Sequence, residues 1–126
     1  MSRLALAAGL CLVMLPSLAA VGTAAEATAV FDTIRSTPAQ LKLHCEQLQL
    51  QRESITAYLR KDTAAASTMG QRINTLQTEL VGYRQAFAFY SGKAGDMAFY
   101  KTAEGKALDK AQKALDGACP KQKLKK

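Results

Sequence analysis

Apolar residues recur with a helical period over most of this chain. One row, spaced alternately four and three residues apart, comprises Leu41, Cys45, Leu48, Ile55 and Leu59, with Arg52 in its middle. A second row with the same spacing comprises Met69, Ile73, Leu76, Leu80, Tyr83, Phe87 and Tyr90. Because this spacing places side chains on one face of a helix, both segments are predicted to be amphipathic helices.

The signals around these rows predict where the helices begin and end. A helix is predicted to begin at Pro38, because Thr37 suits an N-cap and proline suits the first turn. The two rows share one heptad register, so a single long helix is one possibility. We favour a hairpin of helices at 38–61 and 63–91, because the connecting segment is poor in apolar residues and Asp62 can cap the second helix.

A third helix is predicted near the C-terminus. Gly92 and Gly95 are expected to end the preceding helix, and Asp96 or Thr102 to cap the next, which stops at Gly117. Residues 27–34 are predicted to form a short helical element at the other end, with Val30, Phe31 and Ile34 covering the core. The predicted fold is all-α: a small antiparallel three-helix bundle with this N-terminal element, stapled by one disulfide.

The first 25 residues are typical of a secretory signal peptide. Arg3 precedes an uncharged apolar run, and Pro16 and several small residues follow that run. Cleavage is expected after Ala19 or Ala25, with Ala25 favoured. An uncleaved N-terminal membrane anchor is the alternative, since the uncharged stretch is long enough to span a bilayer. The sequence therefore predicts a periplasmic or secreted protein.

Residues 26–126 are predicted to form a single helical domain with a basic tail from about residue 118. The formal net charge of the whole chain is +7. Eight lysines lie in residues 101–126 against three acidic residues. Such an end favours an anionic partner, namely an anionic membrane surface or an acidic envelope protein, whereas export disfavours nucleic acid. The candidate contact residues are Lys121, Lys123, Lys125 and Lys126; a tail that serves only solubility is the alternative.

Two cysteines remain once the signal and its Cys11 are removed. In an oxidising compartment Cys45 and Cys119 are expected to form one disulfide. At 1.5 Å per residue, the third helix can bring Cys119 level with Cys45 only if that helix begins near Thr102. Residues 92–101 are therefore predicted to be a loop or a separate turn; pairing between chains is the alternative.

No catalytic or cofactor site is predicted. His44 is the only histidine and precedes Cys45, but adjacent helical residues point about 100° apart, which disfavours a thiol–imidazole pair. Metal ligands are too few, and haem held between His44 and Met69 or Met97 has little support. Hydrolase motifs are absent from the sequence. We expect a non-enzymatic protein without a cofactor, with His44 facing solvent or the rim of the fold.

An aromatic cluster near one end of the predicted bundle is the other candidate site. It could line a pocket for an apolar ligand or a groove for a partner helix, or it could simply be core. Phe89 falls off the face that carries Phe87 and Tyr90, so at least one ring is expected to point outward. The candidate residues are Tyr83, Phe87, Phe89, Tyr90, Met97, Phe99 and Tyr100.

These observations favour a small exported protein that binds another envelope protein or an anionic envelope surface, as an accessory or chaperone-like factor. The aromatic cluster and the basic C-terminus are the expected contact surfaces. The alternative is a carrier of a small apolar ligand, which predicts an enclosed cavity lined by Tyr83, Phe87, Tyr90 and Phe99.

Overall fold

A computed structural model describes residues 21–121, and this part of the chain is all-helical. Its six helices are α2 (Ala24–Ser36), α3 (Pro38–Leu59), α4 (Thr63–Glu79), α5 (Tyr83–Gly92), α6 (Met97–Lys101) and α7 (Ala103–Gly117). Most of the predicted signal segment, as well as Lys123, Lys125 and Lys126, lies outside the described residues. No helix within residues 21–121 is long and apolar enough to cross a membrane.

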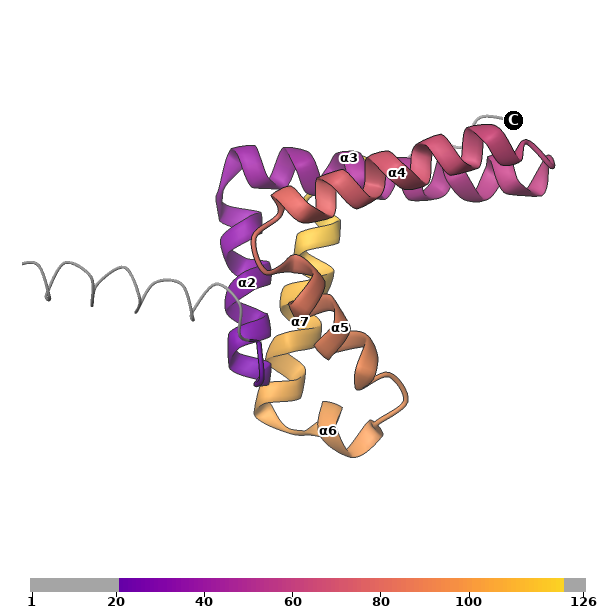
Figure 1. The fold of residues 1–126 in the computed structure, drawn as a ribbon. Coiled ribbons are helices and arrows are strands. Elements are labelled where there is room, and N and C mark those ends of the chain that lie inside the picture. The colour runs from indigo at the N-terminus through magenta and orange to yellow at the C-terminus, as the bar shows by residue number, and fades with distance from the viewer. Residues whose placement is uncertain (1–20, 122–126) are drawn as a thin grey trace, which may run out of the picture.

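The hydrophobic core lies in a body formed by α2, α5 and α7 (Figure 1). Phe31 and Ile34 of α2 are fully buried, as predicted, and they pack with Leu108 and Leu115 of α7. Helix α2 is longer than the predicted element. It begins at the N-cap Thr23, whose Oγ1 accepts a hydrogen bond from the backbone N–H of Glu26.

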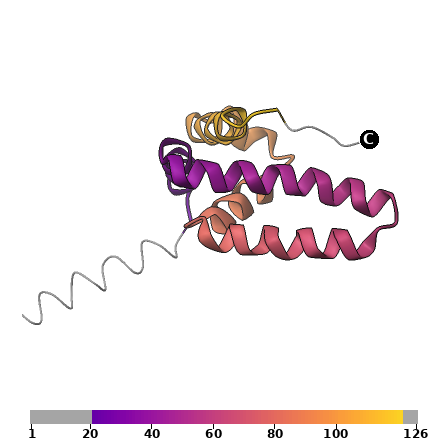
Figure 2. The same ribbon diagram turned by 90° about the horizontal axis from the view of Figure 1, so that it is seen from above.

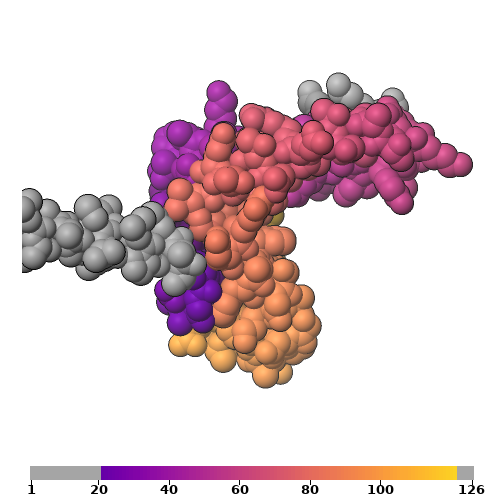
Figure 3. Space-filling model, in the orientation of Figure 1, coloured from indigo at the N-terminus to yellow at the C-terminus, as the bar shows by residue number. Residues whose placement is uncertain are grey.

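Helices α3 and α4 form an antiparallel hairpin, which confirms the predicted hairpin and excludes a single long helix. Figures 1 and 3 show this hairpin as an arm that projects sideways from the body. Helix α3 begins at Pro38, as predicted, although the Thr37 side chain makes no cap hydrogen bond. Its hydroxyl donates instead to the Thr33 carbonyl oxygen, at 2.7 Å. Asp62 caps α4 by accepting from the backbone N–H of Ala65.

The prediction of one continuous helix over 63–91 is wrong, because the chain turns between α4 and α5. Gly82 lies in this turn with φ of 79°, a left-handed conformation that favours glycine. The flanking Leu80 and Tyr83 are both buried, so the turn carries the apolar row from the arm into the body. The antiparallel three-helix bundle is consequently not confirmed.

The predicted interruption before the last helix is confirmed. The short helix α6 occupies part of residues 92–101, and α7 starts directly after Thr102, which accepts from the Gly105 N–H. A Cβ atom on Gly105 would collide with the Phe99 carbonyl oxygen. Glycine at this position therefore permits α6 to fold back closely against α7.

Candidate binding surface

The predicted disulfide joins the arm to the body. Cys45 lies on α3 and Cys119 just beyond α7, with their Cα atoms 5.3 Å apart. The pairing is within one chain, and it follows from the short α7 that starts near Thr102. Figure 2 shows that the end of α7 lies beside α3, on the opposite side from α4.

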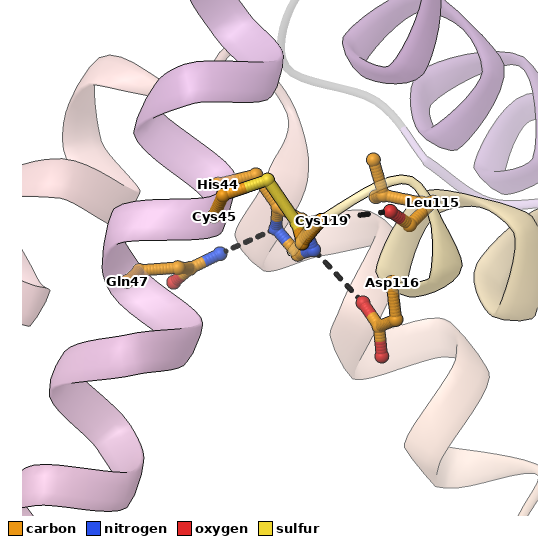
Figure 4. Close-up of a disulfide and its surroundings, with 6 residues drawn as sticks. All are labelled: His44, Cys45, Gln47, Leu115, Asp116 and Cys119. Atoms are coloured by element: carbon orange, nitrogen blue, oxygen red, sulfur yellow. Dashed lines mark hydrogen bonds and ion pairs between the residues drawn. A yellow bond between two sulfur atoms is a disulfide. The ribbon is translucent and has the colours of Figure 1, made fainter. Parts of the chain in front are cut away.

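His44 lies beside this disulfide and is fully buried, so the predicted solvent-facing position is wrong (Figure 4). The Gln47 amide nitrogen donates to His44 Nδ1 at 2.9 Å. The ring proton therefore lies on Nε2, which donates to Asp116 Oδ1 at 2.8 Å. Gln112 donates to the other Asp116 oxygen at 2.7 Å. These hydrogen bonds satisfy the buried ring and fix the end of α7 against α3.

The contacts of His44 and the neighbouring disulfide give these residues a structural role. Both nitrogens of the His44 ring are occupied by neighbouring side chains, and both nearby sulfurs are joined in the disulfide. The two cysteines are therefore not free thiols, and the imidazole is hydrogen-bonded at both nitrogens. Within residues 21–121, no three histidine, cysteine, aspartate or glutamate side chains gather as metal ligands.

The aromatic candidates pack chiefly against one another and against the core. Tyr83 stacks on Phe87 with ring centroids 5.7 Å apart, and Phe89 meets Phe99 edge-on at 6.3 Å. Tyr100 contacts the ring of Tyr90 and donates to the Tyr90 carbonyl oxygen at 3.2 Å. These ring contacts join α5, α6 and the core to one another.

Two members of the aromatic set point outward. Phe87 is 40% exposed and Met97 is 69% exposed. Phe89 is half-buried, although its position in the sequence predicts that it points away from the face that carries Phe87 and Tyr90. The aromatic end thus presents two apolar groups to solvent, while the others hold α5, α6 and the body together.

The buried Tyr83 and the half-buried Tyr90 have raised pKa values. Burial, followed by the negative charge of Asp116, raises the pKa of Tyr83 to about 12. Burial and a hydrogen bond to Asp109 raise the pKa of Tyr90 to about 12 as well. Both phenols are therefore neutral near pH 7 and act there as hydrogen-bonding or packing groups.

The largest apolar exposure on the arm lies along one face of α3. Ile55 is 61% exposed, Tyr58 68% and Leu59 75%. With Leu48 and Arg52 these residues form what we call the open face of α3. Helix α4 covers the opposite side of α3, where Ala57 is buried and Arg72 of α4 pairs with Glu46 at 3.0 Å.

A groove of about 900 Å³ runs between the open face and the residues that follow α7. About two helical turns of α3, from Leu48 to Ile55, form one wall, and the segment around the disulfide forms the other. Its lining is apolar in greater part, with positive charge on both walls. The lining residues are Leu48, Gln51, Arg52, Ile55, Asp116, Gly117, Cys119, Pro120 and Lys121.

The apolar spacing of the open face predicts that it packs in the core, so the sequence does not indicate this groove. The row through Leu48 and Ile55 has the spacing of a buried seam, but the structure places α4 on the other side of the helix. A signal for this was present. Leu43, Leu50 and Ala57 form a second heptad row on a different face of α3, and one hairpin partner can cover only one of the two faces.

Lys121 is the one predicted tail lysine within the described residues, and it is exposed at the edge of the groove. It lies apart from the aromatic end, which is at the far end of the body (Figure 1). Within the described residues the basic tail is thus represented by Lys121, which lies next to the open face of α3.

Comparisons of this chain with protein-family models, with curated proteins and with solved structures found no match.

Proposed function

We propose that this chain is a non-enzymatic, exported protein that binds another protein of the cell envelope through the open face of α3. The single observation that carries the proposal is the exposure of Ile55, Tyr58 and Leu59 on one side of one helix. Contiguous apolar surface of this kind on a small protein marks an interaction site. An accessory or chaperone-like role agrees with a helical body that carries a projecting arm, with a disulfide joining the two.

The location of this surface also supports the proposal. The arm extends away from the core, so a partner can reach its open face without displacing the body (Figures 1 and 3). The basic C-terminal end, with Lys121 at the groove and Lys123, Lys125 and Lys126 beyond it in the sequence, adds an attraction for anionic surfaces. A carrier of an apolar ligand in the aromatic cluster has less support, because these rings pack against one another and the core.

Affinity capture from an envelope extract tests this function, with the disulfide-bonded protein as bait. Ile55→Glu places a charge in the middle of the open face, and Met97→Glu is the matched control at the aromatic end. Both positions are exposed, so both variants are expected to fold. We expect a discrete partner to be retained by the wild-type protein and by Met97→Glu, and lost with Ile55→Glu.

The other outcomes overturn the proposal. Loss with Met97→Glu alone would assign binding to the aromatic end of the body. Equal retention by all three proteins, or no retained protein at all, would remove the open face as the contact surface. Recovery of anionic lipid in place of a protein would favour the membrane surface as the partner.

A further inference from the structure

A pocket of about 550 Å³ lies beside α2, apart from the groove at the disulfide. Its volume falls within the range of roughly 300–1,000 Å³ that is usual for small-molecule sites. Helix α2 contributes the largest share of the lining, and the turn between α4 and α5, which passes close to α2 in Figure 1, forms a wall. We call this site the α2 pocket. It shares no lining residue with the open face of α3.

The surface of the α2 pocket is largely apolar. Val30 of α2 and Val81 of the turn both line it, and Ala29 lies next to Val30 on the helix. Ala29 is exposed and Val81 is 54% exposed, so other parts of the described chain leave these groups open to solvent. A ligand that covers them removes apolar surface from water, which favours binding.

The α2 pocket is elongated. Glu26 lies in the first turn of α2 and Thr37 is the C-cap residue of the same helix, and both line the pocket. At 1.5 Å per residue, these two positions are about 16 Å apart along the helix axis. An extended chain advances by about 1.2 Å per bond, so this length matches a chain of about twelve atoms. The shape therefore suits a linear aliphatic chain.

Glu26 is the charged residue in the lining of this pocket. Its Oε1 accepts hydrogen bonds from the Gly22 N–H at 3.2 Å and from the Thr23 hydroxyl at 3.0 Å. Within residues 21–121 its Oε2 makes no hydrogen bond or ion pair, so this oxygen can accept from an ammonium group. The whole chain has a net charge of +7, but salt screens charges beyond about 8 Å. The carboxylate in the lining therefore favours a cationic ligand.

We propose that the α2 pocket binds a linear aliphatic molecule that carries an amine at one end. The chain lies along α2 across Val30 and Val81, and the ammonium group pairs with Glu26. Because Glu26 is exposed, this ion pair changes the affinity only several-fold, and burial of the chain supplies most of it. This ligand site is additional to the protein contact proposed for the open face of α3.

The test compares dodecylamine with dodecanoate, which have the same chain length and opposite charges at pH 7. Each is titrated below its critical micelle concentration into the isotope-labelled, disulfide-bonded protein, and binding is followed by two-dimensional NMR. We expect the largest shifts at Val30, Val81 and Gly82. Dodecylamine should bind more tightly than dodecanoate by about fivefold at low salt, and this preference should shrink as salt rises.

Three variants separate the contribution of the charge from that of the chain. Glu26→Gln keeps an oxygen that accepts hydrogen bonds but removes the charge, so the two ligands should bind about equally. Ala29→Phe places a ring in the pocket and should weaken both ligands by about tenfold. Ala114→Phe makes the same change at an exposed position on α7 and should weaken neither. Val81→Ser should also weaken both, because it removes apolar contact. Circular dichroism establishes that each variant is folded.

Tighter binding of dodecanoate than of dodecylamine, or an unchanged preference in Glu26→Gln, would overturn the assignment of an amine. Undiminished binding to Ala29→Phe and Val81→Ser would show that the ligands associate elsewhere and would overturn the site. Absence of binding by either ligand, or shifts confined to the open face of α3, would overturn it as well.

Discussion

At the scale of single residues, His44 shows how a lone polar side chain becomes a fixed part of the fold. Its ring is fully buried, yet each nitrogen has a hydrogen-bond partner, Gln47 on its own helix and Asp116 on α7. The partner on the same helix is visible in the sequence, because residues three apart are neighbours on a helix. Asp116 is 72 positions away, and only the tertiary fold brings it to His44.

Removal of the Asp116 carboxylate should lower the free energy of unfolding, because His44 is buried and loses its acceptor. Asp116→Ala leaves a buried ring N–H without its acceptor, and we expect the free energy of unfolding to fall by about 1–3 kcal/mol. Asp32→Ala is the matched control, because Asp32 makes only an exposed pair with Arg35 at 3.7 Å. Urea denaturation followed by circular dichroism measures both. An equal change in the two variants would show that the His44–Asp116 contact contributes nothing specific.

The raised pKa of Tyr83 leads us to expect that the free energy of unfolding falls at alkaline pH. Its hydroxyl ionises near pH 10 in the unfolded chain and near pH 12 in the folded protein, chiefly because it is buried. Between these values the folded protein keeps a proton that the unfolded chain has lost. The stability that this tyrosine contributes is therefore complete below pH 10 and decreases as the pH rises toward 12.

Denaturation of Tyr83→Phe over this pH range checks the assignment. The variant should lose less stability between pH 10 and 12 than the wild-type protein, because it has no hydroxyl to ionise at this position. Tyr58→Phe is the control at an exposed tyrosine and should leave the slope unchanged. The same slope in Tyr83→Phe and the wild-type protein would contradict the role given to burial.

At the scale of helices, the sequence predicts boundaries well where a single local signal decides them. Pro38, Asp62 and Thr102 begin helices where expected, because capping depends on neighbouring residues alone. The break at Gly82 was missed, because the apolar row continues through it without a change of spacing. The sequence does not predict the exposure of the open face of α3 for a different reason. Helix α3 has two apolar faces but one partner helix in the hairpin, and tertiary packing decides which face that partner covers.

Replacement of glycine by alanine is expected to change the free energy of unfolding in opposite directions at Gly82 and Gly70. Gly82→Ala forces a left-handed φ on alanine and crowds Val30, whose methyl would lie 3.1 Å from the new Cβ. We expect a loss of about 1–2 kcal/mol in unfolding free energy. Gly70 lies in the exposed middle of α4 with open space around it, so Gly70→Ala should gain up to about 1 kcal/mol. Thermal denaturation of both variants tests the turn; stabilisation by Gly82→Ala would contradict it.

The start of α2 bears on the predicted signal cleavage. Thr23 and Glu26 hold the first turn through two hydrogen bonds, at 3.0 and 3.2 Å, and Ala24 is buried in the core. Cleavage after Ala25, the site favoured from the sequence, would remove the N-cap Thr23 and the buried Ala24. We therefore expect exported protein to begin after Ala19, and intact-mass measurement of the protein from its own compartment decides this. A mass that begins at Glu26 would contradict the expectation.

At the scale of the whole molecule, the disulfide connects the two parts of the fold. It closes a loop between residues 74 positions apart, which the chain-entropy model values at about 4 kcal/mol. It also holds Pro120 and Lys121 beside α3 and so forms one wall of the groove. The sequence predicts the bond itself from the count of cysteines and the expected compartment. The groove beside the bond depends on which face of α3 is left uncovered, and the sequence does not reveal that.

The open face of α3 is expected to contact a partner in the compartment where the protein works. Photocrosslinking in intact cells, with a photoreactive residue placed singly at Ile55 or Leu59, can detect this contact. Ser67 and Gln71, exposed on α4 in the same arm, are the control positions. We expect a discrete adduct from Ile55 and Leu59 and none from Ser67 and Gln71. Adducts of equal yield from both helices, or from α4 alone, would contradict it.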